Sequence, residues 1–422
     1  MAVKHFREPI LDSSGGGPAS VARNAANRGL PDDQILGLFP LPDLKAKKRK
    51  EFFKERTEQS AVKARITADY FRSWLSIMRV HTRDGRLAYI DLYCGPGTYG
   101  SGQESTPLLV LRVALETREW QKMVVAVFRD KKKRYIDELK KNVAEKIPEA
   151  RLLQHPPDIR RANAAQSDIL QYVENRDTIP IFMFLDPFGY SGLSIRLFRA
   201  ILKNWGCEVL FFFNFNRINL ALRNRSVRER MDELFGKERV ERLKGELRGA
   251  RSAFAKERII LAALRAALNE SGAKIYMLPF RFRPTQKRIS HHLVFCTKNA
   301  HAQKIMKDIM ARESSSHYDG VASFEFAPHV PAQAPVTGAE PPLETLGKEL
   351  LVKFAGRRMT VFRIYEEHND GTNYTMKNYR DVLCRLYYEE ERIEVLTQDG
   401  KEISKASRTR RMSENYIVRF RR

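Results

Sequence analysis

Cysteine is scarce in this sequence, and long apolar runs are missing. The 422 residues include only four cysteines, Cys94, Cys207, Cys296 and Cys384, which lie too far apart to form a CxxC pair. This spacing indicates neither a zinc site nor a disulfide framework. No apolar run reaches the roughly 18 residues that a membrane-spanning helix needs. Met1–Ser20 has no apolar segment of signal-peptide length, so we expect a cytoplasmic protein without a membrane partner.

Acidic residues are also under-represented. The chain has 51 Asp and Glu against 75 Lys and Arg, which gives a net charge of +24. An excess of this size creates a field that attracts phosphate polymers and makes their binding salt-dependent. The excess is spread along the chain rather than confined to a tail. DNA or RNA is therefore the expected partner, and a basic surface that only confers solubility is the alternative.

Changes in composition divide the chain into four segments. Residues 1–49 are rich in Gly, Ser, Pro and Asn and are expected to form a basic, largely irregular extension. Residues 327–342 have the composition of a Pro/Ala-rich linker. This linker separates a large core, residues 50–326, from a small C-terminal domain, residues 343–422, and implies few contacts between them. The basic run Lys45–Lys50 is either a solvated helix face or an arm that contacts phosphates.

Strand-like and helix-like segments alternate through the large core. A helix is expected before the first strand, because Ile66, Tyr70, Trp74 and Met78 recur every four residues. Nearly continuous apolar runs follow, as is typical of strands that helices cover on both sides. The alternation predicts an α/β fold with a Rossmann-like, doubly wound and mainly parallel sheet. Strands are expected at residues 86–93, 123–130, 179–188, 207–215, 273–282 and 291–298.

The segment DLYCGPG follows the first expected strand. Doubly wound sheets bind their ligands beyond the carboxyl ends of the strands, where the strand order reverses. Gly95 and Gly97, on either side of Pro96, let the backbone turn sharply and approach a ligand. Asp91 can accept hydrogen bonds from the loop or from a cationic ligand group. A tight turn without a ligand is the alternative, because GxG often follows a strand by chance.

Two further carboxylates fit an adenosyl ligand. Asp130 ends the second expected strand, where an acidic group can bind both hydroxyls of a ribose. Asp168 precedes another helix, where a carboxylate can accept a hydrogen bond from an adenine amino group. Each signal is weak alone, but in this order they describe an adenosyl ligand on a Rossmann-like sheet.

The segment LDPFG ends a later apolar strand. Asp186 can hydrogen-bond an exocyclic amine, while an aromatic ring such as Phe188, next to the rigid Pro187, can stack on a flipped base. This chemistry points to methyl transfer. Hydride transfer is disfavoured because the loop after the first strand is GPG rather than the GxGxxG of nicotinamide-dependent oxidoreductases.

In this order, DLYCGPG, VFRDKKKRYIDELKKN, SDIL and LDPFG resemble the motifs of class I S-adenosylmethionine-dependent methyltransferases. LDPFG is similar to the Asp/Asn-Pro-Pro-aromatic motif of amino-group methyltransferases, and closer to the Asp-Pro-Phe-Gly of tRNA guanine-N2 dimethyltransferases. Phe188 replaces the second proline. The resemblance implies S-adenosylmethionine as cofactor, bound near Asp91, Gly95, Pro96, Gly97, Asp130 and Asp168, and catalysis at Asp186, Pro187 and Phe188.

A wider resemblance covers the chain from about Lys63 to the C-terminus. The segments ITADYFRSWLSIM, YIDLYCGPGTYGSG, FLDPFGYSGL, HHLVFCTKNAHAQKIMKDIM and FRIYEEHNDGTNYTMKNYRDVLCRLYYEEERIEVL resemble the three-Cys-motif partner protein (TcmP) family. That resemblance implies a partner protein with a three-cysteine, radical-S-adenosylmethionine-like motif. It leaves two functions open: a methyltransferase that acts on a nucleic-acid base amine, and a non-catalytic nucleic-acid-binding adaptor that keeps the fold.

The C-terminal segment has the pattern of a winged helix-turn-helix domain. Helices are expected in residues 347–368 and 372–392, and two strands joined by a turn at Asp399–Gly400 are expected to follow. Tyr379, Leu383, Leu386 and Tyr387 form the expected buried stripe of the second helix. The predicted nucleic-acid contacts are Lys377, Arg380 and Arg385 on the opposite face and Arg408, Arg410 and Arg411 between the strands. A winged helix that docks a protein is the alternative.

Two other segments have both a functional and a structural interpretation. His291 and His292 open an expected strand, but no third ligand lies at a useful spacing, so a structural pair is favoured over a metal site. The loop RFRPTQKR, with Arg281, Arg283, Lys287 and Arg288, is a candidate phosphate-binding loop. A solvated basic loop is nearly as well supported.

Overall fold

The structure is a computed structural model in which the chain forms two compact units, Met1–Arg56 and Thr57–Arg422. It describes residues 46–99, 102–163, 168–175, 178–187, 192–222, 224, 228–270, 272–285, 288–330, 340–404 and 412–421, with the backbone alone at 46–57, 168 and 175. Everything that follows concerns the second unit.

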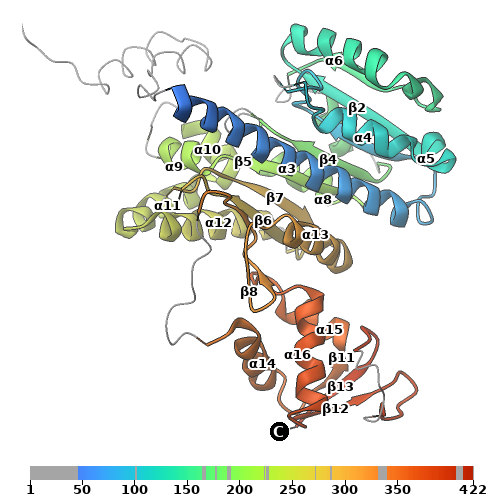
Figure 1. Cartoon of the computed structure of the whole chain (residues 1–422). Coiled ribbons are helices and arrows are strands. Elements are labelled where there is room, and N and C mark those ends of the chain that lie inside the picture. Colours follow the sequence, from blue (N-terminus) through green and yellow to red (C-terminus); the bar gives the residue numbers. More distant parts are fainter. Residues whose placement is uncertain are drawn as a thin grey trace, which may run out of the picture. The chain divides into compact units, whose positions relative to one another are not determined.

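An eight-stranded sheet organises this unit, in the order β10-β6-β7-β5-β4-β1-β2-β3 (Figure 1). All neighbouring strands pair in parallel except β7, which is antiparallel to β5 and β6. The chain order reverses between β1 and β4. The predicted α/β, mainly parallel sheet is thus confirmed. The strands are β1 Leu87–Asp91, β2 Val124–Asp130, β3 Asp158–Arg161, β4 Ile181–Leu185, β5 Glu208–Phe213, β6 Tyr276–Phe282, β7 His291–Thr297 and β10 Glu325–Phe326.

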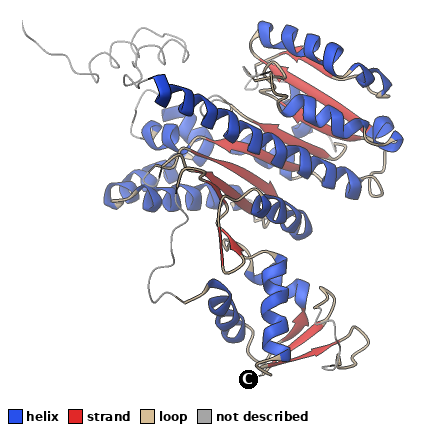
Figure 2. Ribbon diagram, viewed as in Figure 1, coloured by secondary structure: helices blue, strands red, loops and turns tan. Residues whose placement is uncertain are grey.

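Helices cover both faces of the sheet because its strands alternate apolar side chains between two cores. In β1, Leu87 and Tyr89 join one core, while Ala88 and Ile90 join the other. The first face is covered by the part of α3 (Ala46–Met78) that lies in this unit, and by α4 Thr106–Leu115, α5 Arg118–Met123, α6 Lys133–Lys146 and α13 Ala300–Arg312. The second is covered by α7 Asp168–Asn175, α8 Ile195–Leu202, α9 Phe215–Ala221, α10 Arg228–Phe235, α11 Lys237–Gly249 and α12 Ala253–Asn269 (Figure 2).

The predicted apolar stripe of α3 is confirmed. Ile66, Tyr70, Trp74 and Met78 are all buried, and the ring of Tyr70 packs against Phe295, with 4.7 Å between the centroids. This packing fixes α3 across the strands of the sheet. The basic residues at the start of the same helix have no described side chains.

The C-terminal part contains the helices and wing of a winged helix-turn-helix. Tyr379, Leu383, Leu386 and Tyr387 are buried as predicted. The turn at Asp399–Gly400 differs from the prediction, since it returns the chain to a bridge between Leu396 and Glu402 rather than directly to the last strand. The elements are the hairpin β8 His317–Tyr318 and β9 Val321–Ala322, then α14 Pro342–Lys353, β11 Arg358–Thr360, α15 Val361–His368, α16 Met376–Tyr388, β12 Ile393–Leu396 and β13 Ile417–Phe420, with a β11-β13-β12 sheet.

The expectation of few contacts between the sheet and the winged helix is wrong. Lys307 of α13 is fully buried, and its Nζ donates a hydrogen bond to the backbone oxygen of Asn369 at 3.0 Å. Burial lowers the pKa of Lys307 to about 7. Lys304 pairs with Glu414 at 2.7 Å. The Pro/Ala-rich composition of residues 327–342 therefore did not reveal how closely α13 packs against the C-terminal elements.

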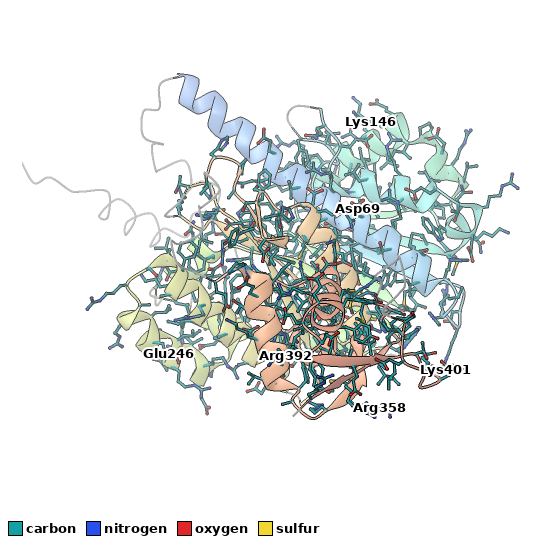
Figure 3. All side chains as sticks on the ribbon, turned by 60° about the horizontal axis from the view of Figure 1, so that its bottom comes forward. Asp69, Lys146, Glu246, Arg358, Arg392 and Lys401 are labelled. Carbon is teal, nitrogen blue, oxygen red and sulfur yellow. The ribbon has the colours of Figure 1, made fainter. Side chains whose placement is uncertain are left out.

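Charged side chains cover the outside of the described elements. Lys146, Glu246 and Lys401, which are labelled in Figure 3, are exposed on α6, on α11 and in the loop after β12. Within the described part of the chain, no helix is long and apolar enough to cross a membrane.

Candidate cofactor and acceptor site

The loop after β1 depends on two glycines in left-handed conformation. Gly95 has φ +63° and Gly97 has φ +86°. A Cβ atom on Gly97 would lie 2.7 Å from Cδ1 of Leu139, which is fully buried in α6, whereas a Cβ on Gly95 would meet nothing within 4 Å. Gly97 is thus required by close packing as well as by its φ angle, and Gly95 by its φ angle alone.

Asp130, at the end of β2, holds this loop in place. Its Oδ2 accepts a hydrogen bond from the Gly95 N–H at 3.2 Å, and its Oδ1 accepts one from the Lys132 N–H at 2.8 Å. Nδ2 of Asn142 donates to the Pro96 oxygen at 2.7 Å, which ties the loop to α6. Each carboxylate oxygen can accept two hydrogen bonds, so Asp130 keeps acceptor capacity for a ligand.

Asp91 lies beneath the loop. It is 1% exposed, and its Oδ1 accepts a hydrogen bond from the Tyr93 N–H at 2.9 Å. Burial raises the pKa of the Asp91 carboxyl well above its usual range. The hydrogen bond from Tyr93 lowers it, and the negative charges of Asp186 and Asp130 raise it further. The three predicted carboxylates Asp91, Asp130 and Asp186 therefore gather at the carboxyl ends of β1, β2 and β4, where the strand order reverses.

Asp186 has a partner that sequence reasoning missed. Nζ of Lys63, on α3, lies 2.7 Å from Oδ2 of Asp186 and 4.4 Å from the centroid of the Phe212 ring. The Lys63 side chain is 12% exposed and that of Asp186 is 30% exposed. The predicted acceptor carboxylate is thus ion-paired and partly open to solvent. Pro187 is buried beside it.

Two predicted residues contribute no described side chain to this site. Asp168 begins α7, with only its backbone described, and Phe188 lies outside the described residues.

The sequence held a signal for Asn142, which follows Leu139 by three residues on the same helix and so lies near the face that packs on the sheet. It held none for Lys63, because pairing across 123 residues depends on the tertiary fold.

The predicted nucleic-acid contacts on α16 differ in their surroundings. Lys377 is exposed and pairs with Asp381 one turn away at 2.5 Å. Because an exposed ion pair contributes little free energy, a phosphate can take the place of Asp381. Arg385 is held by the Leu343 oxygen at 3.2 Å and by Glu390 at 3.0 Å. Arg380 is half-buried. Lys287, Arg408, Arg410 and Arg411 lie outside the described residues.

Arg281 and Arg283 are held in an ion-pair network. Nε of Arg281 lies 2.6 Å from Glu257, and Nη2 of Arg283 lies 2.5 Å from Glu325. Arg283 is 5% exposed. This network corrects the phosphate-loop interpretation for both residues, because Arg283 is buried and paired with Glu325, and the partly exposed Arg281 is paired with both Glu257 and Glu325. Arg288 is exposed.

The histidine pair joins the same region of the sheet. Nε2 of His292 lies 2.5 Å from Oε1 of Glu257, and Nδ1 of His291 lies 2.8 Å from Oγ of Ser290. Burial lowers the pKa of His292, which favours the neutral ring. The described residues include no group of three His, Cys, Asp or Glu that could hold a metal ion.

Substitution of the two glycines is expected to separate conformation from packing. Gly95→Ala should destabilise the protein by about 1 to 2 kcal/mol, the cost of a left-handed alanine. Gly97→Ala should add about 1 to 3 kcal/mol more, because its Cβ also crowds Leu139. Urea unfolding of both variants measures the difference. Equal destabilisation would contradict the packing role of Gly97.

Comparison with known proteins finds a family model that matches the C-terminal part of the chain. Residues 316–400 match the family model of the GMT-like wHTH domain. No curated protein matches the chain.

Several methyltransferase structures resemble the chain in part. The methyltransferase domain of bacterial CtHen1-CN is 12% identical, covers 55% of this chain and 99% of its own, and has a TM-score of 0.29. The predicted O-methyltransferase Atu636 from Agrobacterium tumefaciens is 10% identical, with 54% and 79% coverage and a TM-score of 0.27. The plantazolicin methyltransferase BpumL, in complex with SAH, is 11% identical, with 67% and 100% coverage and a TM-score of 0.29.

The architecture follows from the strand order together with the domain match. The chain combines a mixed, mainly parallel α/β sheet with a C-terminal segment, residues 316–400, that matches the GMT-like wHTH domain.

Proposed function

We propose that this chain is an S-adenosylmethionine-dependent methyltransferase that acts on an amine of a nucleic-acid base. The observation that carries the proposal is the cluster of Asp91, Asp130 and Asp186 around the glycine loop at the switch point of the sheet. Doubly wound sheets bind nucleotide-like ligands at this place.

The residues at the loop fit the cofactor. S-adenosylmethionine carries a sulfonium, an ammonium and a carboxylate group and is a cation overall, and the Asp130 carboxylate beside the loop favours such a cation. The open acceptor capacity of Asp130 suits the ribose hydroxyls. Gly95 and Gly97 keep side chains away from the amino-acid part. When bound, the cofactor would supply the methyl group.

The chain's own part in the reaction is mainly positioning. Asp186 would accept hydrogen bonds from the acceptor amine and hold its lone pair in line for attack. Lys63 must release Asp186, at least in part, when the amine arrives, because both compete for the same carboxylate. The winged helix would hold the nucleic acid. A three-Cys-motif protein remains the proposed protein partner.

Methyl transfer to nucleic acid is the direct test. The full chain is incubated with radiolabelled S-adenosylmethionine and total cellular RNA or DNA, with and without the product of the adjacent gene. We expect label in the nucleic-acid fraction, released after digestion as an N-methylated base. Cofactor binding without transfer to any polymer would contradict the proposed reaction.

Loss of the Asp130 carboxylate is expected to weaken binding of S-adenosylmethionine at least tenfold. Asp130→Ala removes two charge-assisted hydrogen bonds to the ribose, each worth about 1.5 to 3 kcal/mol, and also releases the Gly95 N–H. Calorimetry measures the affinity. Asp137→Ala, which removes an exposed carboxylate from α6, is the matched control and should bind normally. Equal affinities of the two variants for S-adenosylmethionine would show that Asp130 does not bind the ribose.

The ion pair between Lys63 and Asp186 also favours the second candidate, a non-catalytic nucleic-acid-binding adaptor. A carboxylate satisfied within the protein has no need of a substrate amine. The two candidates differ in one result: the adaptor binds nucleic acid and transfers no methyl group, whether or not the partner protein is present.

A further inference from the structure

A groove runs along the outer edge of β6, away from the glycine loop. It has a volume of about 670 Å³ and lies between α12 and the turn Asn369–Asn373, which precedes α16. We propose that this groove binds a single-stranded segment of nucleic acid, with a base against Phe254 and a phosphate at Arg258. The proposal rests on the proposed function for the choice of a nucleic-acid substrate, but it does not depend on methyl transfer.

Charge compensation singles out Arg258. Arg265, which also lines the groove, pairs with Asp370 at 2.5 Å. Arg281 pairs with Glu257. Arg258 is exposed and makes no ion pair with any described residue. Arg258 can therefore bind a phosphate without breaking an ion pair, whereas Arg265 and Arg281 cannot.

Phe254 supplies a stacking surface next to this cation. Phe254 is 40% exposed, and the Arg281 guanidinium lies 5.3 Å from the centroid of its ring. Residues four apart on a helix are neighbours, with Cβ atoms about 6 Å apart. One face of α12 therefore presents an aromatic ring beside Arg258. Sites for single-stranded nucleic acid combine these two groups, one for the base and one for the backbone.

Buried polar atoms around the groove lack partners. His292 and Gln303 both line it, and each is 1% exposed. Neither Nδ1 of His292 nor Oε1 of Gln303 has a hydrogen-bond partner in the described part of the protein. An unpaired buried polar atom costs free energy, and the hydroxyl and amino groups of a nucleotide could satisfy both atoms.

The edge of β6 is unsuited to the other extended polymer, a peptide. Addition of a peptide strand needs unpaired backbone groups along the edge. Pro279 has no N–H to offer, and the Met277 oxygen accepts a hydrogen bond from Nη2 of Arg265 at 3.0 Å. The Arg281 N–H already donates to the Phe324 oxygen at 3.0 Å. The edge is therefore closed to β-strand addition at three successive positions on its outer side.

The groove also lies in a useful place for the proposed reaction. Its inner lining includes His292 of β7, and β7 pairs with β5, the neighbour of β4. Three strand spacings, about 14 Å, separate β6 from β4, the strand that ends at Asp186. The groove is therefore three strands away from the strand that ends at the acceptor carboxylate.

Binding of labelled oligonucleotides tests the groove without the cofactor. Fluorescence anisotropy with the full chain follows single-stranded RNA and DNA of about 12 nucleotides, a length that spans a single-strand site, over a series of salt concentrations. Arg258→Ala should weaken binding about tenfold and lower the log-log salt slope by about 0.7, the share of one phosphate on a single strand. Phe254→Ala should weaken binding about tenfold with an unchanged slope.

Arg242→Ala is the matched control. Arg242 is exposed on α11, makes no ion pair with any described residue and does not line the groove, so its removal costs the same net charge. It should bind within twofold of the wild type. Thermal unfolding of all variants verifies that the fold is intact.

Three results would overturn the groove proposal: affinities of both groove variants that equal that of the control, an equal loss of duplex binding in Phe254→Ala, or competition by a free mononucleotide as strong as that by the oligonucleotide. None of these measurements involves a methyl group. Failure of the proposed function through absence of methyl transfer is thus distinguishable from failure of the groove.

Discussion

Replacement of Asp186 by asparagine is expected to slow methyl transfer by about 10² to 10⁴-fold, the range in which a positioned acid or base contributes. The amide keeps the shape of the side chain and one oxygen that can accept a hydrogen bond from Lys63, so a neutral hydrogen bond replaces the ion pair and no cavity forms. It loses the charge that would orient the amine protons. Binding of S-adenosylmethionine should stay within a few-fold, because Asp186 is assigned to the acceptor. Single-turnover transfer and calorimetry on one preparation separate the two quantities.

Lys63→Met is the companion to this variant. It removes the competing ammonium and leaves a chain of similar volume over the Phe212 ring. If the acceptor amine displaces Lys63 from Asp186, this variant should show a lower KM for nucleic acid, with kcat changed less. Transfer at the wild-type rate by Asp186→Asn would assign the LDPFG segment a structural role and strengthen the adaptor alternative.

The pH dependence of stability is expected to change strongly in Glu208→Gln. Glu208 is buried at the start of β5, where Tyr70 donates a hydrogen bond to its Oε2 and Thr297 Oγ1 donates one to its Oε1 at 3.0 Å. Burial raises the pKa of Glu208 to about 7, although both hydrogen bonds lower it. An unfolded glutamate titrates near about 4.3. The folded protein therefore holds a proton that the unfolded chain releases between these values.

The sign follows from this difference in proton binding. The contribution of Glu208 to stability is fully present below the unfolded pKa and is lost as pH rises through about 7. Between pH 5 and pH 8 the wild type should lose about 2 to 3 kcal/mol relative to Glu208→Gln, whose side chain does not titrate. Urea unfolding of both proteins at the two pH values measures it. Glu246→Gln, at an exposed glutamate of α11, should show no such dependence. A pH-independent difference for Glu208→Gln would contradict a protonated carboxyl in the folded state.

Local pattern was enough to predict six of the eight strands of the sheet, because those strands carry their own signal; the short strands β3 and β10 were not predicted. The apolar runs that become β4 and β5 are buried on both faces, so each run is strand-like without reference to its neighbours. The stripes of α3 and α16 were predictable for the same reason, since helical periodicity records which face is buried. The glycine loop and Asp130 could be predicted to lie close together, because the loop follows β1 and Asp130 ends the neighbouring strand β2.

Features that depend on distant partners could not be predicted. The Lys63–Asp186 pair, the burial of Lys307 and the Glu257 network all join segments that only the tertiary fold brings together. Arg281 and Arg283 illustrate the limit: in the sequence they belong to a basic loop, and only the fold brings Glu257 and Glu325 close enough to pair with them. The sequence shows how many basic residues the chain has, but it does not show which of them form ion pairs with carboxylates in the folded protein.

Asp130 makes the order of assembly of the cofactor loop depend on strand pairing. The register that places Asp91 opposite Phe128 sets Asp130 beyond the end of β1, where it meets the Gly95 N–H, and the Cys94 N–H donates to the Arg129 oxygen at 3.0 Å. A slip of one residue would turn the Asp130 side chain to the opposite face of the sheet. The loop can therefore close only after β1 and β2 have paired in register, which ties any ligand bound there to correctly registered chains.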